Sequence, residues 1–413
     1  METIKGTESL CPVCFKKISA KIIKKGKNVY ITKKCNLHGS FKFLIEKDFG
    51  IYKKLMNKNY HQFRFTKLII PVTSKCNLRC PICFYYPCKD KNLPLEEIEK
   101  IAMNKNLPIF ISGGEPTIRN DLPKMIDVIK QKNSIILVTN GLRFSDYDYA
   151  LKIKKSGLKY VLFSFNGFDD KIYKKINGRA LLRTKLRALR NLKEVDIKII
   201  LSTLVVRGLN ENQIKKIFDF YVKNRSFIRE MRVRSMISTG RYLRRKKLYL
   251  SELLNIVCSN IGIDKKEVFD ELEFWKLVKK FLTKKEFIHR PCSLEFHLKI
   301  KDKRAIPIAR EINLKKISNF RFKRLILLYY LFKIFGIKMF FKWIKTKFDF
   351  TSTLFETDKF LLIDLRSWPS KHDVDLQEIS NCGTGYFMQN KIFSFCYYNI
   401  IKEAKITPDI HFE

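Results

Sequence analysis

The sequence predicts an α/β protein: a partial (β/α)6 barrel with a small N-terminal metal ribbon and an irregular α+β C-terminal region. Between residues 65 and 240, short apolar β-rich runs alternate with helical patterns, and Gly-containing turns follow several of these runs. The third observation is a set of closely spaced cysteines near the start of the chain. The expected domains are therefore 1–50, 65–240 and 241–413, which a chain of 413 residues, 46% of them hydrophobic, is long enough to build.

The N-terminal unit contains two pairs of metal-binding side chains. Cys11 and Cys14 form the first pair, and Cys35 and His38 form the second. Between them, Lys21–Lys33 has the alternation and the Gly-containing turn of two short strands. Three thiolates and one imidazole are a tetrahedral ligand set for Zn²⁺ or a single iron ion. We expect a structural site, because a unit of this size has too little core to fold without metal.

The central zone alternates strand and helix patterns. Six strands are expected, at Thr66–Val72, Ile109–Ser112, Ser134–Thr139, Tyr160–Phe165, Ile197–Val206 and Glu230–Ser235. Helices are expected between them, at Leu95–Met103, Leu122–Gln131, Asp146–Lys155, Leu181–Leu192 and Glu211–Lys223. This alternation predicts a parallel sheet with helices outside, arranged either as a partial barrel or as a doubly wound sheet. In both arrangements, ligands bind at the carboxyl ends of the strands.

A cysteine triplet follows directly on the first of these strands. Cys76, Cys80 and Cys83 have the spacing Cys-x3-Cys-x2-Cys. Three thiolates on one tight loop can bind three irons of a [4Fe-4S] cube, so the fourth iron is open to a small chelating molecule. The alternatives are a zinc site that lacks its fourth ligand and a four-cysteine cluster that uses Cys88.

Small and polar residues stand where the next three strands end. The residues are Gly113, Gly114, Glu115 and Pro116 after the second strand, Asn140 after the third, and Ser164 and Asn166 after the fourth. Two glycines allow the backbone to approach a ligand closely. The carbonyls of residues 113–116 and the Glu115 carboxylate can accept hydrogen bonds from an ammonium group. The small polar side chains of Ser164 and Asn166 suit ribose hydroxyls. Each turn alone is a weak signal, but their order along the strand ends is a strong one.

With these motifs the chain resembles the radical SAM superfamily, which cleaves S-adenosylmethionine (SAM) to a 5′-deoxyadenosyl radical. The resemblance implies that Cys76, Cys80 and Cys83 hold the cluster and that SAM binds its open iron. It also implies an electron donor such as ferredoxin. The residues that it assigns to SAM are Phe84 near the adenine, Gly113, Gly114, Glu115 and Pro116 at the methionine amino group, Asn140 at the third strand end, and Ser164 and Asn166 at the ribose.

Finer features resemble one archaeal and bacterial subfamily with an N-terminal rubredoxin-like or zinc ribbon. They are the ribbon sequence, the helix pattern of Leu182–Leu192, Thr239-Gly240-Arg241, and the cysteine motifs around Cys382 and Cys396. The subfamily contains tetraether lipid synthases and enzymes described as radical SAM pterin methyltransferases. The resemblance to this subfamily implies an auxiliary iron–sulfur cluster. In this chain the available ligands for such a cluster are at most Cys292, Cys382 and Cys396, with or without Cys258. The alternative is that these cysteines are structural thiols.

The net charge of +43 is extreme, and it suits nucleic acid or anionic lipid headgroups as partners. The lysines are spread along the whole chain and not gathered in one tail. This distribution favours the alternative that the charge reflects the amino-acid bias of an AT-rich genome. Leu325–Ile344 is strongly apolar, but Lys333, Lys338 and Lys342 interrupt it, so we expect no membrane span. We expect a basic amphipathic helix that either contacts a membrane surface or packs on the protein's own core.

The expected function is a radical SAM enzyme that abstracts hydrogen from an unactivated C–H bond of an apolar, lipid-like substrate, followed by C–C coupling or methylation. The alternatives are an RNA-modifying radical SAM enzyme, a pterin methyltransferase-like enzyme, and an iron–sulfur or zinc protein that only relays electrons. No side chain stands out as a catalytic acid or base. The cysteine usage and the absence of an apolar leader predict a cytoplasmic protein, with membrane association on the cytoplasmic face.

Overall fold

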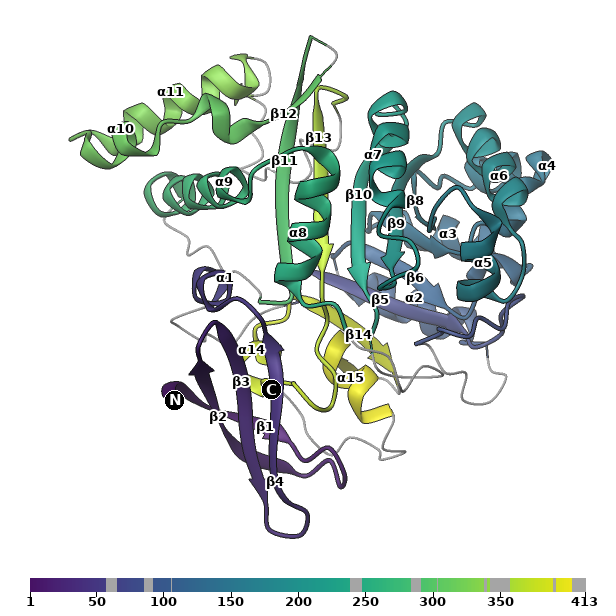
Figure 1. Ribbon diagram of the computed structural model, residues 1–413. Helices are drawn as coiled ribbons and strands as arrows, with labels where there is room; N and C mark the ends of the chain where they lie inside the picture. The colour runs from purple at the N-terminus through teal and green to yellow at the C-terminus, as the bar shows by residue number, and fades with distance from the viewer. Residues whose placement is uncertain are drawn as a thin grey trace.

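The fold is described from a computed structural model, which shows a small antiparallel sheet beside a large, mostly parallel one (Figure 1). The structure describes residues 1–56, 65–84, 92–104, 106–237, 247–283, 291–302, 304–337, 340–341, 357–388 and 391–402. Cys88 and Thr239-Gly240-Arg241, which the sequence analysis singled out, lie outside the described residues.

The N-terminal unit is a four-stranded antiparallel sheet in the order β1-β2-β3-β4. Its strands are β1 (Glu2–Leu10), β2 (Lys17–Lys25), β3 (Asn28–Cys35) and β4 (Gly39–Glu46), and α1 (Phe49–Leu55) follows. The expected central hairpin is present as β2 and β3, and Lys25 lies opposite Asn28 in the pair next to the turn. A small core of Ile22, Val29 and Ile31 packs against Tyr52 of α1, so the packed unit continues past residue 50.

The large sheet contains six adjacent parallel strands in sequence order. They are β5 (Lys67–Thr73), β6 (Ile109–Gly113), β7 (Ile135–Thr139), β8 (Tyr160–Ser164), β9 (Lys198–Val205) and β10 (Ile228–Ser235). The helices between them are α2 (Leu95–Asn104), α3 (Leu122–Ile129), α4 (Tyr147–Lys155), α5 (Asp170–Asn177), α6 (Leu182–Glu194) and α7 (Gln213–Lys223). Because right-handed crossovers between successive neighbours place every helix on the same face, this order gives the partial barrel and not the doubly wound sheet.

The two faces of the barrel sheet have different side chains. On β8, Val161 and Phe163 belong to the main core beneath the helices, whereas Leu162 belongs to a small apolar cluster on the inner face. The inner face becomes polar toward the carboxyl ends, where Ser164 lies opposite Ser202 of β9. A ligand at these ends therefore meets polar groups above an apolar floor.

The C-terminal region is more regular than the sequence analysis expects, because it extends both edges of the barrel sheet. Its strands are β11 (Ser293–Lys301), β12 (Arg304–Pro307), β13 (Phe360–Arg366), β14 (Thr384–Met388) and β15 (Lys391–Ser394). β13 pairs in parallel with β10, and β14 pairs in parallel with β5. Both edges of the six-stranded core are therefore covered by later strands, which satisfies backbone groups that would otherwise stay unpaired.

Among the described residues, the remaining helices are α8 (Leu250–Ile261), α9 (Lys265–Val278), α10 (Leu314–Asn319), α11 (Lys323–Phe335), α14 (Leu376–Ser380) and α15 (Phe395–Lys402). Single turns of other helix types occur at η1 (Pro116–Ile118), η2 (Leu142–Ser145), η3 (Lys279–Thr283) and η4 (Ile308–Glu311). Helices α9, α10 and α11 stand together beyond β11, away from the barrel helices (Figure 1).

The apolar helix expected at Leu325–Ile344 is shorter in the structure. It ends at Phe335 as α11, where Gly336 has a φ of +76°, and Lys338 and Lys342 lie outside the described residues. One face of α11 packs in a core with α9, while the other exposes large side chains: Leu325, Tyr329 and Phe332. Among the described residues, no helix has the length and apolar character that crossing a membrane requires.

Candidate functional site

The ribbon brings its four expected ligands together. Their ligand atoms all lie within 4.8 Å of one another. The Nδ1 atom of His38 is 3.7 Å from Cys11 Sγ and 3.5 Å from Cys35 Sγ, and Cys14 Sγ is 3.9 Å from Cys35 Sγ. These separations suit one tetrahedral ion, for which Zn–S bonds are about 2.3 Å.

The backbone of the ribbon turn favours a thiolate at this site. Burial raises the pKa of the Cys11 thiol, but the backbone N–H groups of Cys14 and Val13 and the neighbouring thiols lower it, to about 7. A thiolate is the form that binds metal. The backbone N–H of Lys16 lowers the pKa of Cys14, but burial and the thiols of Cys11 and Cys35 raise it above its usual value. The ribbon therefore has the donor set and the geometry of a closed metal site.

The cysteine triplet lies on the loop that follows β5, and the barrel holds this loop at several points. The Asn177 side chain, at the end of α5, donates a hydrogen bond to Cys80 Sγ at 3.3 Å. Within the loop, Leu78 N donates to Cys76 Sγ at 3.4 Å. Asn77, between the first two cysteines, accepts a hydrogen bond of 2.7 Å from the Asn140 side chain at the end of β7. The expected residue Asn140 thus contacts the cysteine loop directly.

Gly113 and Gly114 sit against the chain segment that leads into this loop. Gly113 has a φ of +133°, and a Cβ atom on it would lie 2.2 Å from the carbonyl oxygen of Thr73. A Cβ atom on Gly114 would lie 2.1 Å from the carbonyl oxygen of Lys75. Gly114 N and Glu115 N donate to these same two carbonyls, at 2.7 and 2.8 Å. Only glycine permits this contact, which fixes the residues immediately before Cys76.

The Glu115 carboxylate accepts four hydrogen bonds from within the protein, and its contact with a methionine ammonium group stays a prediction. The side chain is 1% exposed. Its Oε1 accepts hydrogen bonds from Thr117 N, Thr117 Oγ1 and Thr139 Oγ1, and its Oε2 accepts one of 2.6 Å from Asn140 N. Burial raises the pKa of Glu115, and these hydrogen bonds oppose the rise. The carboxylate therefore joins the ends of β6 and β7.

Lys185 is an important residue that the sequence analysis missed. Its side chain is fully buried, and Nζ donates to the carbonyl oxygens of Asn140 at 2.8 Å and Ser164 at 2.6 Å. Desolvation lowers its pKa to about 8, while the negative charge of Glu115 acts in the opposite direction. The available signal was its spacing, because a lysine among Leu181, Ala188, Leu189 and Leu192 lies on the buried stripe of the helix.

The other expected SAM contacts have different surroundings. Asn166 is 2% exposed, and its side-chain oxygen accepts a hydrogen bond of 3.0 Å from Leu204 N, so it joins β8 to β9. Ser164 is half-buried at the carboxyl end of β8. Phe84, which follows the cysteine triplet, packs against two C-terminal rings, with centroid distances of 6.1 Å to Trp368 and 6.3 Å to Phe395.

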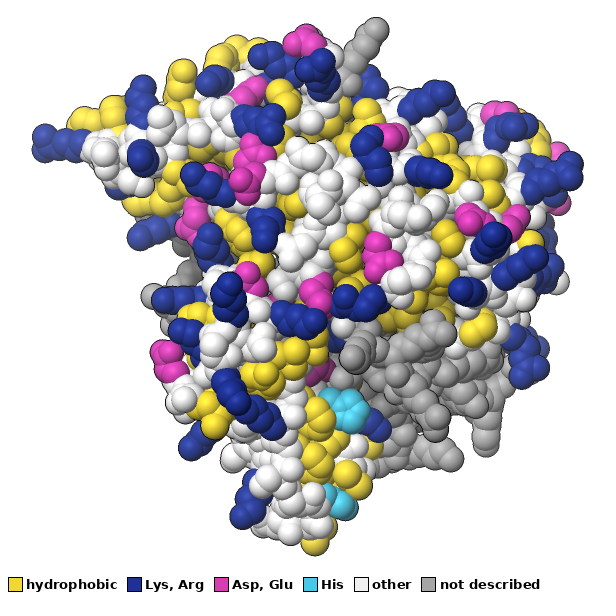
Figure 2. All heavy atoms as spheres, in the orientation of Figure 1, with side chains coloured by type: hydrophobic (Ala, Val, Ile, Leu, Met, Phe, Trp, Pro, Cys, Tyr) yellow, Lys and Arg dark blue, Asp and Glu magenta, His cyan; other side chains and the backbone are white. Residues whose placement is uncertain are grey.

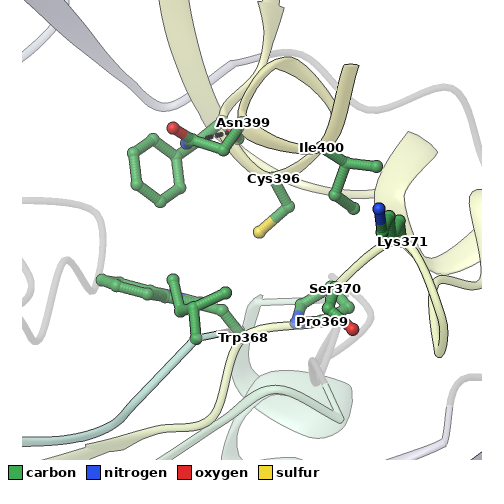
Figure 3. Close-up of a pocket in the computed structure, with 9 residues that line it drawn as sticks. Trp368, Pro369, Ser370, Lys371, Cys396, Asn399 and Ile400 are labelled. Carbon is green, nitrogen blue, oxygen red and sulfur yellow. Dashed lines mark hydrogen bonds between the residues drawn. The ribbon is translucent and has the colours of Figure 1, made fainter. Parts of the chain in front are cut away.

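The three C-terminal cysteines Cys292, Cys382 and Cys396 line one cavity of about 90 Å³, although they are far apart in the sequence. Asp373, Asp375 and Glu378 also line it. Figure 3 shows Cys396 in a smaller neighbouring cavity, with its sulfur directed toward Trp368 and Pro369. Among the described residues, only the ribbon set has three or more such ligands within single-ion distance.

Cys258 lies away from this cavity. It is 4% exposed on α8 within the main core, and burial raises its pKa to about 12. It is therefore a structural thiol.

Comparison with known proteins agrees with this geometry. Residues 70–221 match the radical SAM superfamily, and residues 3–47 match the HMPTM N-terminal zinc ribbon domain. The chain carries a radical SAM domain behind a zinc ribbon. It is an enzyme, and the radical SAM domain implies a [4Fe-4S] cluster and SAM as cofactors.

The similar proteins include two curated enzymes. The 7,8-dihydro-6-hydroxymethylpterin dimethyltransferase of Methanocaldococcus jannaschii is 30% identical over 273 residues, which cover 57% of this chain and 54% of that protein. The GTP 3′,8-cyclase of Campylobacter jejuni strain RM1221 is 30% identical over 208 residues, covering 48% of this chain and 64% of that protein. The chain thus spans between half and two thirds of the length of these relatives. Among solved structures, Streptococcus suis SuiB bound to S-adenosylmethionine has a TM-score of 0.42 at 22% identity, covering 51% of this chain and 48% of that chain.

We predict that the two metal sites load independently, because the ribbon and the β5 loop each supply their own thiols. Cys14→Ser should lose the ribbon ion and keep the iron of the cluster, whereas Cys80→Ser should keep the ribbon ion and lose most of the iron. Elemental analysis of anaerobically reconstituted protein measures both, and each variant is the control for the other. Loss of both metals in both variants would contradict separate sites.

We also predict that Glu115→Gln lowers the melting temperature of the SAM-free protein. Each oxygen of Glu115 accepts a hydrogen bond from a backbone N–H group. In glutamine an NH2 group replaces one of these oxygens, so one buried N–H donor loses its acceptor, at a cost of about 1–3 kcal/mol. Glu99→Gln, on the exposed side of α2, is the matched control and should melt like the wild type. Equal melting of all three proteins would show that the carboxylate does not hold the strand ends together.

Proposed function

We propose that this enzyme cleaves SAM reductively at the carboxyl ends of its barrel strands and uses the resulting radical to abstract hydrogen from an unactivated C–H bond. The observation that carries the proposal is the convergence of the Cys76–Cys80–Cys83 loop, the glycine pair and the Asn140 and Ser164 strand ends in one place. The chemistry supplied by a bound cluster and SAM is one-electron cleavage to a 5′-deoxyadenosyl radical.

The chain's own residues would hold and orient these groups. We assign Cys76, Cys80 and Cys83 as cluster ligands, which the Asn177 and Asn77 hydrogen bonds keep in position. The carbonyls of Gly113 and Gly114 would accept from the methionine ammonium group, and Ser164 would contact the ribose. Phe84, packed against Trp368, would cover the adenine side of the site. Asn166 and Glu115 would act indirectly, by holding these strand ends.

We propose an auxiliary role for the cavity lined by Cys292, Cys382 and Cys396. Three thiols from separate segments surround a space that also reaches α1 of the ribbon unit. Such a set can supply three ligands to a second iron–sulfur cluster. The carboxylates of Asp373, Asp375 and Glu378 line the same cavity and disfavour the negative charge of cysteine thiolates. The competing assignment is therefore that these cysteines are structural thiols.

As the substrate we propose an apolar, lipid-like molecule taken from a membrane surface. The supporting observation is the outer face of α11, where Leu325 is 62% exposed, Tyr329 55% and Phe332 47%, together with the N-cap residue Phe322, which is 60% exposed. Apolar side chains are visible over the part of the surface where α10 and α11 lie, among lysines and arginines (Figure 2). An exposed apolar face with basic neighbours suits the boundary of an anionic membrane.

A second candidate is methylation of a pterin-like heterocycle. The dihydropterin dimethyltransferase named above supports it, because the chain shares with it a 30% identical stretch of 273 residues. An RNA substrate has weaker support, since the basic side chains in Figure 2 are spread over the visible face without forming one stripe.

We predict that reconstituted protein given dithionite and SAM produces 5′-deoxyadenosine and that Cys83→Ala abolishes the product. Loss of one thiolate removes a ligand of the cluster, while Cys258→Ala should retain product formation because Cys258 lies in the core. Liquid chromatography with mass detection measures the nucleoside. Absence of the product from the wild-type protein with its full iron content would overturn the proposed function.

We predict that the outer face of α11 binds membranes. The double variant Leu325→Ser/Phe332→Ser should bind vesicles of phosphatidylglycerol at least about tenfold more weakly, because each inserted side chain contributes about 1.5–3 kcal/mol when fully buried. Leu186→Ser, which removes an exposed leucine from α6, is the control. If sedimentation finds equal binding for all three proteins, α11 is not the membrane contact.

A further inference from the structure

Three arginines lie on the inner face of the barrel sheet, on neighbouring strands. Met231 and Val233 of β10 belong to the core beneath the helices, so the alternating residues Arg232 and Arg234 point to the other face. On β13 the same alternation places Arg366 inside. Arg234 is directly opposite Arg366 in the parallel pairing, and both lie at the carboxyl ends of their strands.

The carboxylates on this face neutralise only two of the three arginines. Arg232 pairs with Glu230 at 2.7 Å and with Asp364 at 2.9 Å. Arg366 pairs with Asp364 at 2.7 Å and with the half-exposed Glu295 at 3.3 Å. Burial raises the pKa of Glu230 to about 7, although Arg232 and Arg366 act in the opposite direction. Glu230, Asp364 and Glu295 are each paired with Arg232 or Arg366, and among the described residues no carboxylate pairs with Arg234.

Arg234 is the arginine that remains without a counterion. Among the described residues it has no ion pair, and its Nε atom is inaccessible to solvent and has no hydrogen-bond partner. Burial, with Arg232 and Arg366 nearby, lowers its pKa to about 10. Two positive charges directly opposite each other on neighbouring strands, such as Arg234 and Arg366, repel each other. A charged group that is shielded from water and has no partner is also unfavourable. Such an arrangement is stabilised when an anion binds.

The guanidinium of Arg234 is also close to the cluster loop. Its Cζ atom lies 5.7 Å from the centre of the Trp368 ring. Trp368 in turn packs against Phe84, at a centroid distance of 6.1 Å, and Phe84 directly follows Cys83. A ligand group at Arg234 is thus separated from the cysteine triplet by two aromatic rings, at the same end of the barrel.

We propose that Arg234 and Arg366 bind a phosphate group of the substrate at the carboxyl ends of β10 and β13. A phosphate carries up to two negative charges, and two guanidinium groups match its oxygens with paired hydrogen bonds. This assignment rests on the proposed function, because it places the substrate beside the cluster. The phosphate can belong to a lipid headgroup or to a small phosphate ester.

The test is calorimetric titration of inorganic pyrophosphate into the anaerobically reconstituted enzyme at about 0.15 M KCl, where surface attraction is screened. We expect the wild type to bind and Arg234→Gln to bind at least about tenfold more weakly. The matched control is Arg143→Gln, which removes an exposed arginine that also stacks on a ring, that of Tyr149, and should bind like the wild type.

A second measurement separates a ligand site from a structural arginine. Because Arg234 has no counterion, Arg234→Gln should melt at the same temperature as the wild type or higher, whereas Arg366→Gln, which leaves Asp364 with one partner fewer, should melt lower. Vesicles of phosphatidylglycerol and soluble glycerol phosphate then distinguish a lipid headgroup from a small phosphate ester. The site uses the one whose binding is weakened by Arg234→Gln, and either result supports the proposal.

The proposal is overturned if the wild type does not bind pyrophosphate or if Arg234→Gln binds it equally well. It is also overturned if Arg234→Gln weakens only SAM binding, because the anion would then be the carboxylate of SAM. These outcomes differ from failure of the proposed function. Formation of 5′-deoxyadenosine by the wild type tests that function without requiring any substrate phosphate.

Discussion

The architecture of the site depends on the backbone of one residue, Asn140. Glu115 accepts a hydrogen bond from its N–H, and Lys185 donates one to its carbonyl oxygen. Both charged side chains are almost completely removed from water, where a charge is stable only with good partners. Because Lys185 also donates to the carbonyl oxygen of Ser164, the Asn140 backbone and the two charges fix the ends of β6, β7 and β8 relative to one another. The cysteine loop then rests on the same residue through Asn77.

This constraint explains why the side chains of two expected SAM contacts, Glu115 and Asn166, make hydrogen bonds within the protein, while their contacts with SAM stay predictions. A glutamate or asparagine at a strand end has the same appearance in a sequence whether it faces a ligand or a neighbouring strand. In this fold the Glu115 and Asn166 side chains turn toward β7 and β9, whose backbone groups require partners. In the proposed function, the contacts with SAM therefore come from backbone carbonyls, a serine hydroxyl and an aromatic ring.

The sequence predicted the elements whose signals are local. The six barrel strands follow from short apolar runs, and the ribbon and the cysteine triplet follow from spacing alone. The edge strands β13 and β14 were missed because their partners, β10 and β5, are more than a hundred residues away in the sequence. The same applies to Arg234, whose position opposite Arg366 depends on a pairing between distant segments. Lys185 was accessible to a local argument, because its place on the apolar stripe of α6 is visible in the sequence.

The two late edge strands also affect the order in which the molecule is made. The six central strands are complete once Ser235 has been synthesised, but β13 and β14 begin at residues 360 and 384. Until those segments leave the ribosome, β5 and β10 expose unpaired backbone groups, and such edges promote aggregation of incomplete chains. The cysteine loop follows one of these edges. Late closure of the sheet therefore leaves the edge beside the cysteine loop unpaired until almost the whole described chain has been made.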